Sequence, residues 1–231
     1  MFKHEIPNTP IHSNIPQLIE VSGSHHEMGR QIGEAARLKI QHSVENARVL
    51  INAAYSTLEL TWDGAKIQAR KYLPFAEERY PQYVDELRGI AEGANLSLDD
   101  IMVLNAMEAV TGDALHLTRC TSMSVNDERT ANGHVLAAHN EDWIPEDEDD
   151  VLIISAKPDK EPPYLAMTYG GLLPNVGFNA YGIAQLIDSV YPADSRIGIP
   201  RLVVARAVLS SRRISGAIGR TLVPHRAAGY N

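Results

Sequence analysis

The chain has 231 residues, of which 44% are hydrophobic, and its 29 acidic and 21 basic side chains give a net charge of −8. This length and composition are those of a globular protein with ample capacity to bury a core. The acidic balance argues against binding to nucleic acid or to an anionic membrane. The longest apolar runs are too short to span a membrane, and Met1 to Glu5 lacks an apolar signal core. One cysteine favours a reducing compartment, so we expect a cytoplasmic protein.

The first third of the chain predicts a strand followed by helices. A proline-rich arm over residues 1–17 leads into a short strand at 17–21. Ser24 and Glu27 have the spacing of a helix capping box, and apolar residues then recur at helical intervals. We therefore predict a long amphipathic helix from about 25 to 56.

Two pairs of residues in this helix invite a functional interpretation. His25 and His26 are adjacent, so their side chains point about 100° apart on a helix, and we expect both to be solvated rather than to hold a metal. Gly29 and Gly33 are four residues apart without a phosphate-binding loop around them. They therefore predict close packing against another element.

Three shorter helices are expected next. The first runs from Lys66 to Leu73 and ends at Pro74, the second covers 83–93, and the third begins at Ser97. The third is apolar almost throughout, which predicts that it is buried.

The only cysteine, Cys120, begins a segment that predicts a β-hairpin. Polar and apolar residues alternate after it, a polar turn occupies 126–133, and an apolar strand returns. The return strand brings Asn140 and Asp142 back to the level of Cys120 and places them on one face.

A cysteine nucleophile at the start of a strand, with no histidine at an obvious partner spacing, needs a base. Cleavage of the chain between Arg119 and Cys120 would supply one, since a free α-amino group has a pKa of about 7.7–8.0. In this interpretation Asp142 orients the ammonium or the thiol and Asn140 supplies hydrogen-bond donors. A buried structural role for Cys120 is the alternative.

The remaining segments complete a mixed α+β pattern. The acidic run at 146–150 is expected to be a solvated loop, because successive carboxylates cannot all turn to one metal ion. Two strands are expected at 151–156 and 164–168, followed by a hairpin turn of Asn-x-x-Gly type at 179–182. Two helices are expected at 200–209 and 215–222.

Several motifs together resemble one family of enzymes. The first is the Cys-Thr-Ser run followed by Asn-x-Asp and an aromatic, at 120–143, and the second is the Gly-Ser opening with Gln-x-Gly-Glu, at 23–34. The other two are the Ala-Glu-Gly-Ala sequence at 91–94 and the Gly-Phe-Asn-x-x-Gly hairpin at 177–182. The chain resembles the acyl-coenzyme A:6-aminopenicillanic acid acyltransferase (isopenicillin N acyltransferase) family, which consists of autoproteolytic N-terminal nucleophile (Ntn) hydrolases.

This resemblance implies a fold and a domain organisation. It implies a four-layer αββα sandwich with two antiparallel sheets over a single domain at 1–231, here lacking its C-terminal portion. Residues 1–119 would be a mainly helical small chain, and residues 120–231 would carry the nucleophile. The two self-cleaved chains would stay together, and homo-oligomers are left open.

The resemblance also implies a mechanism. The proenzyme would cleave itself before Cys120, which would then form a thioester acyl-enzyme supported by Asp142. Arg119 departs from the small or acidic residue expected there. No metal or organic cofactor is required. The acyl donor is a small molecule: a coenzyme A thioester, a β-lactam side chain, or an N-acyl amino acid or peptide.

Three further residues are assigned to substrate binding: Thr121, Asn179 and Asp188. The family commonly has an asparagine near the acyl-enzyme carbonyl where this chain has Asp188, and an ionised carboxylate cannot donate to an oxyanion. Asp188 would instead select a cationic or amine-bearing substrate, or it is a loop residue. Arg196 and Arg201 are expected to neutralise it.

Two other classes of function are kept as alternatives. One is a metal-assisted hydrolase that uses His134, His139, Glu141 and Asp142, although strand alternation places only His139 and Glu141 on a common face. The other is a catalytically silent binding or assembly module.

Overall fold

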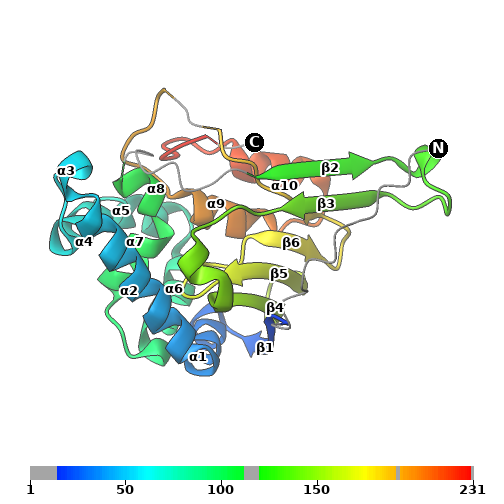
Figure 1. The fold of residues 1–231 in the computed structure, drawn as a ribbon. Helices are drawn as coiled ribbons and strands as arrows, with labels where there is room; N and C mark the ends of the chain where they lie inside the picture. Colours follow the sequence, from blue (N-terminus) through cyan, green and yellow to red (C-terminus); the bar gives the residue numbers. More distant parts are fainter. Residues whose placement is uncertain (1–14, 112–119, 191–192, 230–231) are drawn as a thin grey trace, which may run out of the picture.

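The computed structural model describes residues 15–111, 120–190 and 193–229, and it shows a mixed α+β fold with two sheets (Figure 1). The larger sheet has the strand order β1-β4-β5-β6-β7, and the smaller is the hairpin β2-β3. Their bounds are Gln17–Gly23 (β1), Thr121–Val125 (β2), Leu136–Asn140 (β3), Val151–Pro158 (β4), Tyr164–Tyr169 (β5), Val176–Asn179 (β6) and Ala184–Gln185 (β7). The mixed class is therefore confirmed, while the four-layer arrangement stays a prediction.

One strand pair departs from the predicted antiparallel sheets. β1 pairs with β4 in parallel, with Gln17 opposite Leu152 and Gly23 opposite Pro158, whereas β4-β5, β5-β6 and β6-β7 are antiparallel. Tight turns force neighbouring strands to run antiparallel, but β1 and β4 are separated by the helices and the β2-β3 hairpin. Such a long crossover leaves their direction free.

The helices lie mainly before the hairpin, and two follow the larger sheet. Their bounds are His25–Ala35 (α1), Arg37–Ala53 (α2), Tyr55–Leu58 (α3), Trp62–Arg70 (α4), Leu73–Arg79 (α5), Pro81–Ala94 (α6), Leu98–Asn105 (α7), Met107–Val110 (α8), Arg201–Val208 (α9) and Ile214–Thr221 (α10). Short 3₁₀ helices cover Asp127–Arg129 (η1) and Pro145–Asp150 (η2). None of the helices within these described ranges is both long and apolar enough to cross a bilayer.

Two helix predictions need correction. The single helix expected over 25–56 is interrupted at Ala36 and Ala54, where the backbone leaves helical geometry with ψ near 19° and 11°. Pro74 does not end a helix but lies in the first turn of α5, where a missing N–H leaves no hydrogen bond unmade. The capping box at Ser24 and Glu27 is confirmed.

Glycines allow α1 and α6 to pack with their backbones in contact. A Cβ atom at Gly29 would lie 2.1 Å from the carbonyl oxygen of Glu86, and one at Gly33 would lie 2.5 Å from that of Ile90. On α6, Cβ atoms at Gly89 and Gly93 would come just as close to the backbone of α1. This confirms that Gly29 and Gly33 serve close packing.

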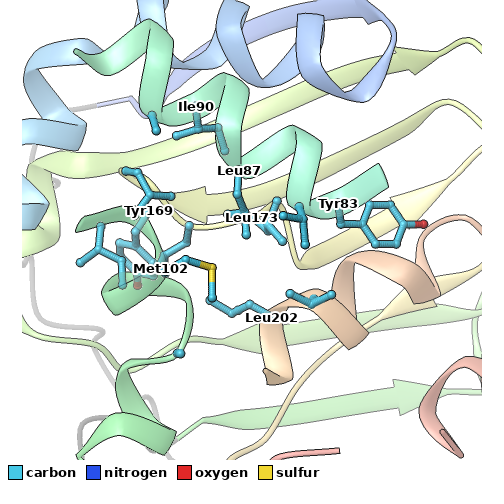
Figure 2. Close-up of a cluster of buried hydrophobic side chains, with 14 of the residues drawn as sticks. Tyr83, Leu87, Ile90, Met102, Tyr169, Leu173 and Leu202 are labelled. Carbon is cyan, nitrogen blue, oxygen red and sulfur yellow. The ribbon is translucent and has the colours of Figure 1, made fainter. Parts of the chain in front are cut away.

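The main core lies where the helices meet the larger sheet. Figure 2 shows side chains from α6, α7, α9, the end of β5 and the following loop converging there: Tyr83, Leu87, Ile90, Met102, Tyr169, Leu173 and Leu202. The predicted burial of the third short helix is confirmed, because every residue from Asp100 to Asn105 in α7 is buried. This core fixes α9 against the sheet.

A buried ion network crosses the same layer and corrects the prediction for His25. Arg206 and Glu86 have fully buried side chains, and the Arg206 Nε atom lies 3.1 Å from both carboxylate oxygens of Glu86. His25 Nδ1 lies 2.8 Å from Glu86 Oε2, and Arg206 Nη1 lies 3.3 Å from Glu161 Oε2. His25 is thus an ion-pair partner rather than a solvated residue.

The carboxylates of this network set the charge of His25. Burial lowers the pKa of His25, but hydrogen bonds to Glu161 and Glu86 outweigh it and raise that pKa to about 9. Burial raises the pKa of Glu161, yet the hydrogen bond to His25 and the charge of Arg206 bring it down to about 2. Two cations therefore face two anions, and α1, α6 and α9 are tied together.

The acidic run at 146–150 is not the solvated loop that we expected. Asp147 and Asp150 are buried within η2. Asp147 accepts hydrogen bonds from Asn46 Nδ2 and from Trp143 Nε1, both at 2.8 Å, and Asp150 Oδ2 accepts one from Ser43 Oγ at 3.1 Å. These bonds attach the segment after the hairpin to α2.

Candidate active site around Cys120

The predicted hairpin is confirmed, and its register decides which side chains share a face. Thr121 pairs with Asn140 and Ser122 pairs with His139, so one further step places Cys120 opposite Glu141. Partners in an antiparallel pair point to the same side, and successive residues alternate. Cys120 therefore shares a face with Ser122, His139 and Glu141.

This register places Thr121 and Asn140 away from the Cys120 sulfur. Both are exposed and lie on the face opposite Cys120. The Asn140 side chain is therefore not placed to supply donors beside the sulfur. Arg119 lies outside the described residues.

The Cys120 thiol is partly exposed and held in its protonated form. Burial raises its pKa to about 11, and the negative charges of Glu141 and Asp142 act in the same direction. A hydrogen bond with the Asp142 backbone and the charge of Arg201 oppose this shift without outweighing it. The sulfur therefore needs a base before it can act as a nucleophile at neutral pH.

A histidine and a carboxylate lie beside this sulfur. Donor atoms of Cys120, His139 and Glu141 all lie within 4.8 Å of one another. His139 Nε2 is 2.7 Å from Glu141 Oε2, and the two side chains are only 5% and 14% exposed. We expected His139 and Glu141 to share a face, but only as ligands in a metal-assisted hydrolase. Pairing the two hairpin strands residue by residue adds Cys120 to that face.

A relay of hydrogen bonds continues from His139 to the segment after β7. His139 Nδ1 is 3.0 Å from Ser122 Oγ, which donates to Asp188 Oδ1 at 3.0 Å. Asp188 is thus joined to the hairpin. Of the two arginines expected near Asp188, Arg196 pairs with Asp194 and Arg201 pairs with Glu108.

Aromatic side chains border the cluster. The Trp143 ring stacks on Tyr169, with centroids 5.5 Å apart and planes 27° apart. The pKa of Tyr169 is raised, first by burial and then by the charges of Glu141 and Asp147. Tyr169 therefore belongs to the acidic surroundings of Cys120.

Asn179 has a structural position rather than the substrate contact that we expected. It is buried, its Nδ2 atom donates to the carbonyl oxygens of Leu209 and Ser211, and its Oδ1 atom accepts from the backbone N–H groups of Tyr181 and Ile183. These bonds occupy its amide and hold the β6-β7 turn against the end of α9.

An apolar groove of about 450 Å³ lies between the β7 segment and the helices α9 and α10. Its apolar walls include Ile183, Leu186, Val204, Ala205, Ala217 and Ile218. Arg201 also lines this groove, and the same guanidinium influences the Cys120 thiol. The groove and the thiol therefore share Arg201 as a neighbour.

Fold and site together define a mixed α+β protein whose reactive groups gather around one cysteine at the head of a hairpin. The chain matches the family described as acyl-coenzyme A:6-aminopenicillanic acid acyl-transferase over residues 129–231. This match and the two relatives below confirm the resemblance seen in the sequence.

Two curated relatives match most of the chain. It is 26% identical over 215 residues to the Beta-alanyl-dopamine/carcinine hydrolase of Drosophila melanogaster, a match that covers 84% of this chain and 54% of the relative. It is 24% identical over 201 residues to the Acyl-coenzyme A:6-aminopenicillanic-acid-acyltransferase 40 kDa form of Emericella nidulans, with 86% and 54% covered. The chain spans about half the length of these relatives.

Proposed function

We propose that this chain is a self-processing cysteine hydrolase or acyltransferase that acts on small acyl amides or acyl-coenzyme A thioesters. The observation that carries the proposal is the position of Cys120. Its sulfur lies beside the His139–Glu141 pair and forms a hydrogen bond with the Asp142 backbone. The family match supports acyl transfer as the chemistry, since one relative is named as an acyltransferase and the other as a hydrolase.

Self-cleavage is the first step of the proposal. The Cys120 sulfur attacks the carbonyl carbon of Arg119, the peptide C–N bond breaks, and a thioester to the sulfur forms as the Cys120 nitrogen becomes an amine. Water then hydrolyses that thioester and releases the thiol. Glu141 and His139 lie close enough to receive the thiol proton that this step must remove. Residues 1–119 and 120–231 would then be two chains.

Turnover follows with a different base. The new α-amino group of Cys120 has an ordinary pKa of about 7.7–8.0, so a useful fraction is neutral near physiological pH and can accept the thiol proton. The thiolate attacks the acyl carbon, the leaving amine or thiol takes the proton, and a thioester acyl-enzyme remains. Water or a second amine then releases the acyl group. The orienting role of Asp142 rests on the sequence resemblance and on the hydrogen bond between its backbone and the thiol, and its side chain has to turn toward the new ammonium.

The surroundings of Cys120 support a substrate with an apolar part and a basic part. The apolar groove beside Arg201 has a volume suited to a small molecule. Asp188, Glu141 and Asp142 give the hairpin side a negative charge that favours an amine-bearing substrate. We therefore favour an acyl amide of a small amine over an anionic substrate.

Acyl-enzyme trapping tests this proposal. The purified protein is incubated with a set of acyl amides and acyl-coenzyme A thioesters, quenched in acid and weighed by mass spectrometry. We expect a mass increase equal to one acyl group, located on the peptide that begins at Cys120. Cys120→Ala should show none. An adduct elsewhere, or none with any acyl donor, would remove Cys120 as the nucleophile.

A further inference from the structure

The hydrogen bonds around His139 determine which of its ring nitrogens carries a proton and which one faces Glu141. A carboxylate only accepts, so the Ser122 hydroxyl must donate its proton to Asp188. Ser122 Oγ then has only lone pairs left for His139, so the Nδ1 atom must carry the proton between them. The Nε2 atom therefore faces Glu141 Oε2 at 2.7 Å, and either a proton or a cation has to lie between them.

The atoms that surround this position form a metal-binding set. A thiolate, an imidazole nitrogen and a carboxylate oxygen are the ligand types that zinc prefers, and three protein ligands with an open fourth position are common at reactive zinc sites. Cys120, His139 and Glu141 offer these three types within 4.8 Å of one another. The Ser122–Asp188 relay fixes the His139 tautomer, as second-layer partners do at zinc sites.

The distances fit with a small closure. Zinc bonds of about 2.3 Å to sulfur and 2.0–2.1 Å to nitrogen place tetrahedral donors roughly 3.5 Å apart. Since all three donor atoms lie within 4.8 Å of one another, no pair has to close by more than about 1.3 Å, and the His139–Glu141 pair has to open by about 0.8 Å from 2.7 Å. Both adjustments are within the reach of side-chain rotation. The partly exposed thiol leaves a path for the ion and for a water molecule as fourth ligand.

We propose that Cys120, His139 and Glu141 bind one Zn²⁺ ion and that this ion inhibits the protein by occupying its nucleophile. Binding forms a Zn–S bond and releases the thiol proton and the proton held between His139 and Glu141 to solvent, with no change of oxidation state. A sulfur bound in this way cannot attack a carbonyl carbon. The inhibition rests on the proposed function, whereas the binding does not.

Calorimetric titration of the full chain with Zn²⁺, after removal of bound metals, tests the binding. We expect one ion per chain and a loss of affinity of at least about ten-fold in each of Cys120→Ser, His139→Ala and Glu141→Gln. His134→Ala is the matched control, because His134 is an exposed histidine of the same hairpin outside this cluster, and it should bind as wild type does. Circular dichroism checks that each variant is folded.

Two spectroscopic and chemical readouts separate this site from adventitious histidine binding. Co²⁺ should give a thiolate charge-transfer absorption that disappears in Cys120→Ser. Zn²⁺ should protect Cys120 from iodoacetamide in wild type and in His134→Ala but not in His139→Ala. No ion bound, or equal binding and protection in His139→Ala, would overturn the proposal.

The inhibition has its own readout. Zn²⁺ should stop self-cleavage and acyl transfer at concentrations that match its binding curve, and a chelator should restore both. If the protein binds Zn²⁺ at this site but neither cleaves itself nor accepts an acyl group without it, the proposed function fails and the metal site stands. If it is active and Zn²⁺ has no effect at saturation, the inhibitory role is wrong.

Discussion

Two hydrogen-bonded groups of polar and charged side chains in this protein differ in their surroundings and in what they do. In the network of Arg206, Glu86, Glu161 and His25, two cations face two anions, and the side chains of Arg206 and Glu86 are fully buried. The second group runs from Asp188 through Ser122 and His139 to Glu141. There one imidazole is linked to two carboxylates and lies beside the partly exposed Cys120.

The difference shows how one chain separates stability from reactivity. In the first network the opposite charges are buried or nearly so and balance one another, and they link α1, α6 and α9. In the second group, a proton or a cation has to lie between His139 Nε2 and Glu141 Oε2, and this position is next to a sulfur whose pKa is raised to about 11.

Removing Arg206 should have the largest effect. Arg206→Met leaves the Glu86 carboxylate buried without its cation, and we expect the free energy of unfolding to fall by about 3–5 kcal/mol in urea denaturation. Arg196→Met is the control, because the Arg196–Asp194 pair is exposed and such pairs contribute about 0–1 kcal/mol. Equal losses in the two variants would show that the buried network does not stabilise the helices.

Removing His139 should slow self-cleavage without unfolding the chain. General acid–base partners contribute about 10²–10⁴-fold, and we expect His139→Ala to lose a factor in that range in the rate at which the intact chain disappears on a denaturing gel. His134→Ala should cleave at the wild-type rate. A wild-type rate in His139→Ala would assign the thiol proton to another group.

Separating α1 from α6 should have a smaller effect on stability. A Cβ at Gly93 would lie 2.3 Å from the Arg30 carbonyl oxygen, so Gly93→Ala forces the helices apart and should lower the free energy of unfolding by about 1–3 kcal/mol. Gly219→Ala in α10 is the matched control, since nothing lies within 4 Å of its added Cβ. There we expect a gain of about 0.5–1 kcal/mol, and a gain at both positions would refute backbone contact.

The pH dependence of stability should be the most gradual effect. Because the pKa of His25 rises from 6.5 to about 9 on folding, its contribution is complete below pH 6.5 and is lost as the pH rises through 9. The pKa of Glu161 falls from 4.5 to about 2, so its contribution is complete above pH 4.5 and is lost as the pH falls through 2. Urea midpoints measured across this range should decline on both sides, and His25→Gln should flatten the alkaline decline. An unchanged alkaline slope in that variant would remove His25 as its cause.

Local pattern predicted much of the fold. Alternation and turn residues located the hairpin after Cys120, and four-residue spacing indicated the role of Gly29 and Gly33. Arg206 and Glu86 are 120 residues apart, and no local pattern joins them, so the buried network and the parallel β1-β4 pair were missed. Both depend on tertiary packing rather than on periodicity.

The candidate site was predicted in part. The motifs predicted Cys120 as the nucleophile with Asp142 and Asn140 beside it, whereas His139 and Glu141 were considered only as ligands of a metal-assisted hydrolase. Side chains alternate between the two faces of a strand, so the exact pairing of the strands decides which residues share the face of Cys120, and a shift of one residue exchanges the faces. The contact of Ser122 with Asp188 needs the position of the segment after β7, which the sequence does not specify.

Intact mass spectrometry of the freshly purified wild-type chain and of Cys120→Ala shows whether Cys120 cuts its own chain. We expect wild type to separate into two masses, those of residues 1–119 and 120–231, and Cys120→Ala to keep a single mass for the whole chain. A wild-type chain that stays whole while its thiol remains unreactive towards alkylation, or a Cys120→Ala chain that is cut at the same bond, would contradict this expectation.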